Sequence, residues 1–176
     1  MLLSKYEVEV LTAKDLRLPE VEETGTTFAQ NAALKAVAAA KKTGITALAD
    51  DSGLCVDALG GRPGVYSARY APNRDFDKGM DMLLSELNGV PTERRKTHFM
   101  CVLALAEPNG DCRFFEGRVD GKIAEHKSGK TGFGFDPVFV PDGYDKTFAE
   151  MSSQEKGSIS HRGNAFKKFI TEVFEK

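Results

Sequence analysis

The sequence predicts a mixed α/β protein with a bent central sheet flanked by helices, folded as two lobes with a cleft between them. The first observation behind this prediction is the order of patterns, in which strand and helix patterns alternate before a run of strands and a final helix. The second is the length of 176 residues, which suits one domain covering 1–176. The third is the absence of an internal repeat or a flexible linker, so we expect two lobes that are not independent domains.

The first third of the chain predicts two strands around one helix. Residues 7–11 alternate valine with other residues, which is typical of a short strand. Residues 26–44 predict a helix, because Thr27 and Gln30 have capping-box spacing, alanine fills the interior, and two lysines and a glycine mark the end. Residues 45–49 form an apolar run that predicts a second strand, which ends at two acids, a serine and a glycine.

The remainder of the chain predicts a second helix, three strands and a last helix. Residues 75–87 carry apolar side chains at helical spacing and stop at Asn-Gly. The apolar stretches 98–107 and 112–124 flank PNGD and should pair as a long hairpin. Residues 132–140 predict another strand, with its proline at a strand end or a bulge. The last helix should start near residue 162 and run to residue 174.

Composition excludes several classes of partner. Lys plus Arg number 24 and Asp plus Glu number 26, so the net charge is −2 and no basic field is available for a nucleic acid. No apolar run approaches the ~20 residues that cross a membrane, so we expect neither a nucleic acid nor a membrane partner. Cys55, Cys101 and Cys112 are odd in number and widely spaced, which predicts buried free thiols and a cytoplasmic protein.

Four groups of polar residues could carry chemistry. They are the loop acids Glu22 and Glu23, the helix pair Asn31 and Lys35, the run Asp50-Asp51-Ser52-Gly53, and the C-terminal segments GKTGFGFDP (129–137) and EKGSISHRG (155–163). Each group alone has an ordinary explanation, because loop acids are usually solvated, lysines usually reach the surface, and Asp, Ser and Gly commonly form turns. GKTGFG resembles a phosphate-binding loop only superficially, since its lysine precedes a predicted strand.

Together the four groups predict a site for a nucleotide and a magnesium ion. Carboxylates are the hard oxygen ligands that Mg²⁺ prefers, and a carboxylate beside the ion can take a proton from an attacking water. Lysine and arginine would neutralise phosphate oxygens. Phe133 and Phe135 offer flat faces for a base, and Asp136 offers an acceptor for its N–H groups. His161 and Arg162 could donate to a keto oxygen.

Four motifs carry a resemblance to a known family. The segments ETGTTFAQNAALKA, ALADDSGLCVDALGGRPGVYSARYA, GFGFDPVFVPDGYDKTFAEM and EKGSISHRGNAF together resemble the inosine triphosphate pyrophosphatase family. The resemblance extends from about Met1 to the C-terminus. It implies a homodimeric hydrolase that cleaves ITP, dITP and XTP to the nucleoside monophosphate and pyrophosphate, through water attack on the α-phosphorus. Such an enzyme would cleanse the nucleotide pool.

The resemblance also implies a role for each matching residue. Asp51 would be the general base, Lys35 would contact the phosphates, and Glu22 or Glu23 would hold Mg²⁺ together with Asp51. The other positions that would line the substrate site are Asn31, Ser52, Phe133, Gly134, Phe135, Asp136, Lys156, His161 and Arg162. The last three would read the 6-oxo group of the purine, which accepts where the 6-amino group of adenine donates.

One part of the family pattern is not found in this sequence. The family normally begins with a strand and a phosphate-binding turn of the type [ST]xNxxK, whereas residues 1–4 here resemble the end of the helix that follows. One alternative is therefore a weakened or non-catalytic nucleotide-binding form. Another is a pyrophosphatase for modified pyrimidine or methylated nucleotides, against which SHRG argues. A structural or RNA-binding module finds little support in the net charge.

Overall fold

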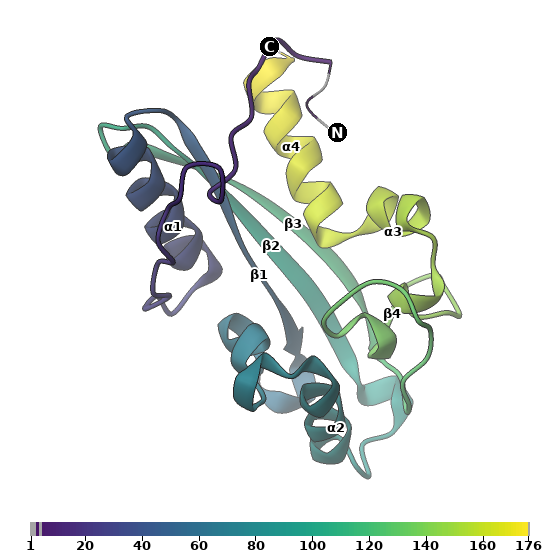
Figure 1. The fold of residues 1–176 in the computed structure, drawn as a ribbon. Coiled ribbons are helices and arrows are strands. Elements are labelled where there is room, and N and C mark those ends of the chain that lie inside the picture. The colour runs from purple at the N-terminus through teal and green to yellow at the C-terminus, as the bar shows by residue number, and fades with distance from the viewer. Residues whose placement is uncertain (1–2, 4, 176) are drawn as a thin grey trace.

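The core of the fold is one four-stranded antiparallel sheet, seen in a computed structural model that describes residue 3 and residues 5–175 (Figure 1). Its strands, in the order β1-β2-β3-β4, are β1 (Ala47–Val56), β2 (Lys96–Ala106), β3 (Cys112–Ile123) and β4 (Phe139–Pro141). The hairpin expected from PNGD is present as the β2–β3 pair. Helices cover both faces of this sheet, which confirms the mixed α/β class.

Helix α1 (Phe28–Thr43) packs closely on the sheet because its buried face is made of alanine. The predicted capping box is present, and Gly44 ends the helix in the left-handed region with φ 73°. Ala32, Ala36 and Ala40 are fully buried and share a hydrophobic cluster with alternate residues of β2. This close packing sets the distance between α1 and β1, and so the positions of Asn31 and Lys35 of α1 relative to the strand.

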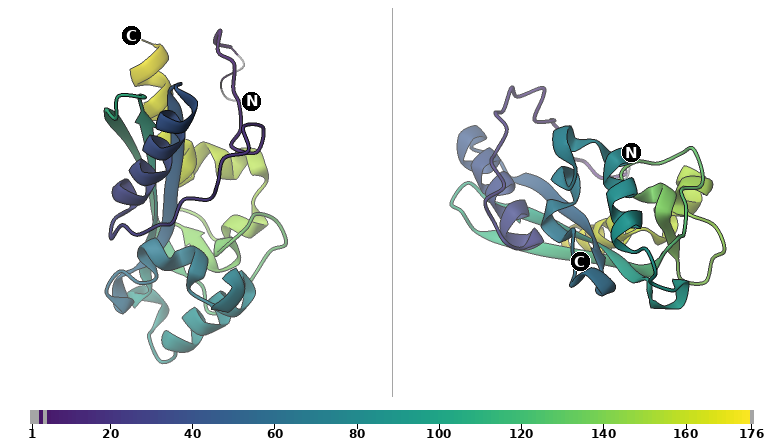
Figure 2. Two further views of the ribbon diagram at one scale, coloured as in Figure 1. Left: turned by 60° about the vertical axis from the view of Figure 1, so that its left-hand side comes forward. Right: turned by 90° about the horizontal axis from the view of Figure 1, so that it is seen from below.

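Helix α4 (His161–Phe174) covers the opposite face of the same strands. Cys101 and Leu103 of β2 belong to its cluster, whereas Val102 and Ala104 belong to that of α1, as the alternation of a strand requires. The views in Figures 1 and 2 agree in placing the two helices on different sides of the sheet. A side chain at Gly117 would overlap the carbonyl oxygen of His161, so β3 and the start of α4 approach closely only because this residue is glycine.

The second lobe is built around α2 (Phe76–Glu86) at the far end of the sheet. Its core contains leucines of α2 together with Leu54 and Phe99 from the long strands. Helix α3 (Ser153–Ile159) leads into α4, and Ser160 ends the first helix and caps the second by accepting the Gly163 N–H. Within the described residues, no helix is both long and apolar enough to span a membrane.

Three sequence-based expectations about elements are wrong. Residues 7–11 form no strand: Val8, Val10 and Leu11 are 40–46% exposed, and no described strand pairs with this segment. The strand predicted at 132–140 is reduced to β4, because Gly132 and Gly134 have positive φ and Pro137 has no N–H to donate.

The third wrong expectation is that a strand ends just before Asp50 and Asp51. The predicted strand 45–49 does not stop at the acids but continues through them as β1, because ten residue pairs with β2 hold the whole segment extended. Other details also differ from the pattern. Helix α3 was not predicted, Cys101 is buried, and Cys55 and Cys112 are only half-buried, all three as free thiols. Of the N-terminal segment 1–4 compared with the family, only residue 3 lies within the described residues.

Candidate active site

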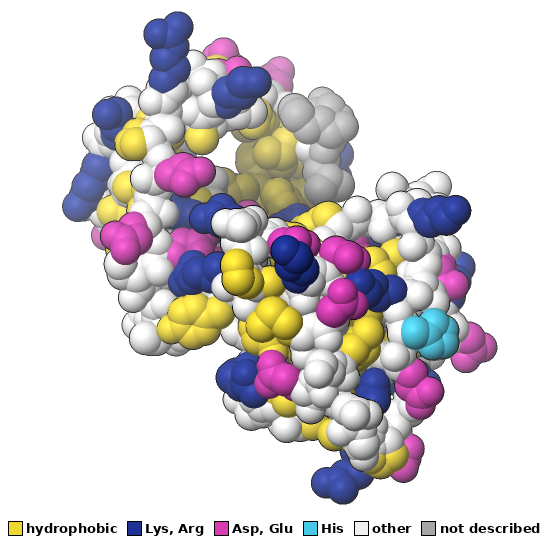
Figure 3. All heavy atoms as spheres, turned by 60° about the horizontal axis from the view of Figure 1, so that its bottom comes forward, with side chains coloured by type: hydrophobic (Ala, Val, Ile, Leu, Met, Phe, Trp, Pro, Cys, Tyr) yellow, Lys and Arg dark blue, Asp and Glu magenta, His cyan; other side chains and the backbone are white. Residues whose placement is uncertain are grey.

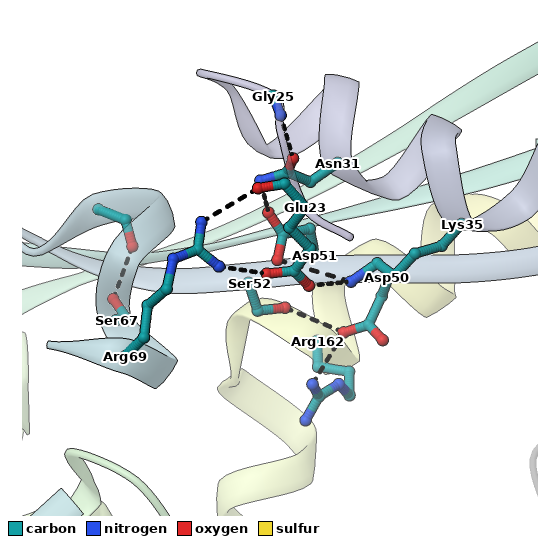
Figure 4. A network of polar contacts seen from close by, with 11 residues as sticks. Glu23, Gly25, Asn31, Lys35, Asp50, Asp51, Ser52, Ser67, Arg69 and Arg162 are labelled. Atoms are coloured by element: carbon teal, nitrogen blue, oxygen red, sulfur yellow. Dashed lines mark hydrogen bonds and ion pairs between the residues drawn. The ribbon is translucent and has the colours of Figure 1, made fainter. Parts of the chain in front are cut away.

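The two adjacent acids of β1 serve opposite faces of the sheet. Successive side chains of a strand point to opposite sides. Asp51 Oδ2 accepts a hydrogen bond from Asn31 Nδ2 of α1 at 3.1 Å, whereas Asp50 Oδ2 accepts one from Arg162 Nη2 of α4 at 2.8 Å (Figure 4). Because the acids lie within the strand and not in a turn after it, their peptide unit separates two groups of functional side chains.

The first group, here called the α1-side cluster, consists of Glu23, Asn31, Lys35, Asp51 and Arg69. Lys35 Nζ lies 2.8 Å from Glu23 Oε1 and 3.7 Å from Asp51 Oδ1. Arg69 Nη1 lies 2.9 Å from the other oxygen of Glu23. Asn31 is fully buried and its Oδ1 accepts the Gly25 N–H, which ties the acidic loop to α1.

Burial and charge set opposite pKa shifts on the two carboxyls of this cluster. Burial raises the pKa of Asp51, the Asn31 and Lys35 side chains oppose the rise, and the negative charge of Glu23 adds to it, so that the pKa is raised overall. Burial also acts to raise the pKa of Glu23, but Lys35 and Arg69 outweigh it, so that this pKa is lowered overall. Asp51 is therefore the better proton acceptor of the pair.

The α1-side cluster offers two carboxylates that could hold a divalent metal ion. No three His, Cys, Asp or Glu side chains among the described residues are arranged to hold a metal by themselves. Mg²⁺ usually takes only one or two carboxylates and completes its shell with water and substrate phosphates. The carboxylates of Glu23 and Asp51 both face one cation, the ammonium of Lys35. Glu22 is exposed, whereas Glu23 is half-buried; both line a pocket of about 930 Å³ that extends from Lys35 past Arg69.

Arg69 is a site residue that the sequence interpretation did not single out. It ends the short 3-10 helix Gly64–Arg69, in the loop that follows β1. Ser67 Oγ accepts the Leu54 N–H at 2.9 Å, and a side chain at Gly53 would overlap the carbonyl oxygen of Gly64. This close contact between loop and strand brings Arg69 to Glu23. Its position inside the family-like segment GVYSARYA is the feature of the sequence that could have identified it.

The second group, here called the α4-side cluster, consists of Asp50, Ser52, Phe133, Asp136, Lys156, His161 and Arg162. Phe133 is 60% exposed, and Lys156 Nζ and Arg162 Cζ lie 4.8 and 5.5 Å from its ring centre. Asp136 is buried, pairs with the Lys156 ammonium and accepts the Phe133 N–H at 2.8 Å. These contacts hold both cations against the exposed ring.

Phe135 is placed differently from Phe133, although the sequence interpretation treated the two alike. It is 2% exposed and meets Phe76 edge to face, with ring centres 5.7 Å apart. Gly134 has φ 64°, and the turn that this conformation makes sends the two rings in different directions. Phe133 therefore presents an open face, whereas Phe135 supports the wall of the pocket.

His161 is buried as a neutral imidazole at the start of α4. Its ring stacks on Phe99 with centres 4.6 Å apart. Burial first, and then the charges of Arg162 and Lys156, lower its pKa to about 3. Its Nδ1 is buried and has no hydrogen-bond partner among the described residues. Since buried polar atoms are normally paired, this nitrogen is suited to a polar group of a ligand.

The two clusters meet in one pocket of about 250 Å³. Its lining includes Lys35 and Asp51 from one cluster and Phe133, Asp136, His161 and Arg162 from the other. A pocket of about 520 Å³ extends from Phe133 along α3 and α4, and one of about 930 Å³ extends from Lys35 past Arg69. Figure 3 shows charged side chains of both signs gathered where the halves of the molecule meet.

Comparisons with known proteins relate the whole chain to one family. The model of the Ham1 family matches residues 1–172. A dITP/XTP pyrophosphatase of Mesorhizobium japonicum is 47% identical over 183 residues, which cover 96% of this chain and 83% of the relative. One of Brucella melitensis is 48% identical with the same coverage. The structure of a HAM1 protein from Coxiella burnetii superposes with a TM-score of 0.94 at 41% identity, over 99% of this chain and 90% of that one. The Staphylococcus aureus Ham1 protein gives 0.86 at 43% identity, over 93% and 85%.

Proposed function

The chain belongs to the Ham1 family, and from this premise we propose that it hydrolyses non-standard purine nucleoside triphosphates. The substrates are ITP, dITP and XTP, and the products are the nucleoside monophosphate and pyrophosphate. The observation that carries the proposal is one pocket lined by both clusters: Lys35 and Asp51, a cation and a carboxylate suited to a phosphate, from the α1 side, and the exposed Phe133 ring with Arg162 against it from the α4 side.

In this proposal Asp51 acts as the general base. It takes a proton from a water molecule whose oxygen forms a bond to the α-phosphorus, while the bond from that phosphorus to the bridging oxygen breaks and pyrophosphate leaves with the electron pair. The raised pKa of Asp51 supports this role, because a carboxylate with a higher pKa is a stronger base. Lys35, whose side chain is 27% exposed, would neutralise phosphate charge in the same pocket.

We propose that Glu23 and Asp51 hold a Mg²⁺ ion when the nucleotide is bound, and that Arg69 fixes the Glu23 carboxylate. The ion would supply Lewis-acid polarisation of the phosphate oxygens. Lys35 contacts both carboxylates in the structure. When the ion and the nucleotide bind, the ion would take these carboxylates as ligands and the Lys35 ammonium would turn to the phosphate oxygens.

The α4-side cluster would select the base. A purine can stack on the exposed face of Phe133, with Lys156 and Arg162 beside the same ring as donors to a 6-oxo group. The 6-amino group of adenine would present a donor to these donors, and such a mismatch costs roughly 1–3 kcal/mol for each buried group. Asp136 Oδ2 already accepts the Phe133 N–H and pairs with Lys156, so it supports this arrangement.

A product assay tests the proposal. The protein is incubated with dITP, XTP, dATP or dGTP in the presence of Mg²⁺, and pyrophosphate and monophosphate are quantified. We expect equal amounts of the two products, with dITP and XTP cleaved much faster than dATP. Release of single phosphates would overturn the mechanism. Tight dITP binding without hydrolysis would favour a non-catalytic nucleotide-binding form instead.

We further propose that the protein works as a homodimer in the cytoplasm. The family resemblance supports the dimer, and the free thiols of Cys55, Cys101 and Cys112 favour a reducing compartment. Sedimentation equilibrium measures the first property directly, and a monomer at every concentration tested would contradict it.

A further inference from the structure

Asp50 lies beside the proposed base but faces the other cluster. We propose that Asp50 is a positioning residue for base selection, whose carboxylate holds the Arg162 guanidinium over Phe133 at the place where the 6-oxo group is read. This inference rests on the proposed function and deepens it, because it assigns the first acid of the Asp50-Asp51 pair a task separate from hydrolysis.

The contact between Asp50 and Arg162 is direct and partly shielded. Arg162 Nη2 lies 2.8 Å from Asp50 Oδ2, with the two side chains 39% and 38% exposed. Ser52 Oγ donates to the same carboxylate oxygen at 3.1 Å. Ser52 is two residues along β1, so it lies on the same face and fixes the rotamer of Asp50. The Asp50 carboxylate is therefore held by Ser52 of its own strand as well as by Arg162 of α4 (Figure 4).

The charge arrangement around Phe133 explains why Arg162 needs this partner. Two cations lie within 5.5 Å of one aromatic ring, Lys156 at 4.8 Å and Arg162 at 5.5 Å, and they repel each other. The Lys156 ammonium is paired with Asp136, and the Arg162 guanidinium with Asp50. Each cation thus has one carboxylate, and without Asp50 the guanidinium would gain by moving away from Lys156 toward solvent.

The guanidinium also keeps donors for a substrate. Arginine has five N–H groups in a rigid planar fork. Within the described part of the chain, the Arg162 side chain makes one hydrogen bond to protein, through Nη2 to Asp50. Fixing one arm of the fork sets the direction of the other arms, so Asp50 determines where a keto oxygen finds its donor.

The strand register separates this role from the chemistry at Asp51. Asp50 is paired with Leu103 and Asp51 with Val102, and these two β2 residues belong to the hydrophobic clusters of α4 and α1 respectively. Asp50 therefore acts through Arg162, on the side of the base, whereas Asp51 faces Asn31 and Lys35.

The test compares D50N with D120N, using dITP and dATP as substrates. Asp120 is the control, because it also pairs with an arginine, Arg118 of the same strand, but is 54% exposed and outside all three pockets. We expect D50N to lower kcat/KM for dITP about 30-fold, mainly by raising KM, and to change the weak dATP reaction less than about 3-fold. D120N should match the wild type, and circular dichroism should show D50N folded.

A second comparison asks whether Asp50 acts through Arg162. In an R162Q background the further change D50N should cost less than about 2-fold, because the residue to be positioned is already gone. D50E, which keeps the carboxylate, should recover part of the selectivity for dITP. Equal losses with dITP and dATP, a loss confined to kcat, or full additivity of D50N and R162Q would each overturn the proposal.

Binding of monophosphates separates this inference from the proposed function. If the wild type releases no pyrophosphate from dITP, the proposed function fails, but calorimetry with IMP and AMP still tests the positioning role. We expect the wild type to bind IMP more tightly than AMP and D50N to reduce this difference about 10-fold or more. Equal binding of IMP and AMP by the wild type, or an unchanged preference in D50N, would overturn the role of Asp50.

Discussion

The α1-side and α4-side clusters contain the same charges but differ in what surrounds them. Each has two carboxylates and two cations: Glu23, Asp51, Lys35 and Arg69 on one face of β1, and Asp50, Asp136, Lys156 and Arg162 on the other. The α1 side has one ring, Tyr66, with Arg69 Cζ 5.1 Å from its centre, whereas the α4 side has Phe133 against both of its cations and His161 stacked on Phe99. In the proposed function, the Phe133 ring is what makes the α4 side the one that binds a flat, neutral base.

The two adjacent acids of β1 show how contacts divide the work. Burial acts to raise the pKa of both, but at Asp50 the Arg162 guanidinium and the Ser52 hydroxyl outweigh burial and lower the pKa overall. At Asp51 the opposing groups are a neutral amide and an ammonium at 3.7 Å, and the pKa is raised overall. A base must be able to accept a proton, and a positioning carboxylate must keep its charge. The lesson is that direct pairing, more than burial, separates the two tasks.

The largest expected effect is the loss of turnover in D51N. Because an amide cannot accept the proton of the attacking water, we expect kcat for dITP to fall by about 10³-fold or more. Substrate binding, measured by calorimetry, should persist, since the α4-side cluster is untouched. D57N, at an exposed acid just after β1, is the control and should retain activity. A fully active D51N would remove Asp51 as the base.

The next effect in size concerns stability on the α4 side. K156M leaves Asp136, with its side chain 3% exposed, without its cation, and we expect the free energy of unfolding to fall by about 3 kcal/mol. K146M breaks the more exposed pair with Glu155 and should cost less than about 1 kcal/mol. Urea unfolding measures both changes. If D136N in the K156M background restored no stability, an unpaired carboxylate would not be the cause.

The pH dependence of stability should reveal His161. Its pKa is about 3 in the folded protein and 6.5 ordinarily. Between pH 6.5 and pH 3 the unfolded chain therefore binds a proton at this residue that the folded protein does not. This contribution to stability is complete above pH 6.5 and is lost as the pH falls toward 3, at up to about 1.4 kcal/mol per pH unit. The loss between pH 7 and pH 5 should shrink by about 2 kcal/mol in H161F. H126Q, at an exposed histidine, should leave it unchanged.

The smallest expected effect is at Phe133. Because its ring is 60% exposed, F133L should change the free energy of unfolding by less than about 0.5 kcal/mol. Loss of the stacking face should raise KM for dITP about 10-fold and leave kcat nearly unchanged. F114L, at a ring 44% exposed on β3, should change neither quantity. An unchanged KM in F133L would mean that the base does not stack there.

The local parts of this fold could be predicted from sequence, and the site partners only in part. The capping box at Thr27 and the hairpin at PNGD depend on neighbouring residues, and both predictions are confirmed. The sequence pattern places a strand end at the acids, because Asp is rare inside strands. In the structure each acid has a hydrogen-bond donor from a distant segment, Asn31 for Asp51 and Arg162 for Asp50. These donors stabilise carboxylates that would otherwise be unfavourable inside a strand.

The family resemblance indicates which residues belong to the site, but only the structure shows where their side chains point. Phe133 and Phe135 match the same motif, but a glycine turn exposes one ring and buries the other. Arg69 reaches Glu23 from 46 residues away, through a loop whose contact with Gly53 leaves no periodic pattern in the sequence. Long-range contacts of this kind are set by tertiary packing and not by spacing along the chain.

The ten residue pairs between β1 and β2 make the site sensitive to insertions and deletions in a particular way. A residue added between Ala47 and Asp50 would reverse the parity of the strand and exchange the faces to which the two acids point. A residue added at Ile45 or Thr46, before the first pair, would leave that parity intact. The chain can therefore vary in length up to the edge of this ladder, but inside it the count of residues is as decisive as their identity.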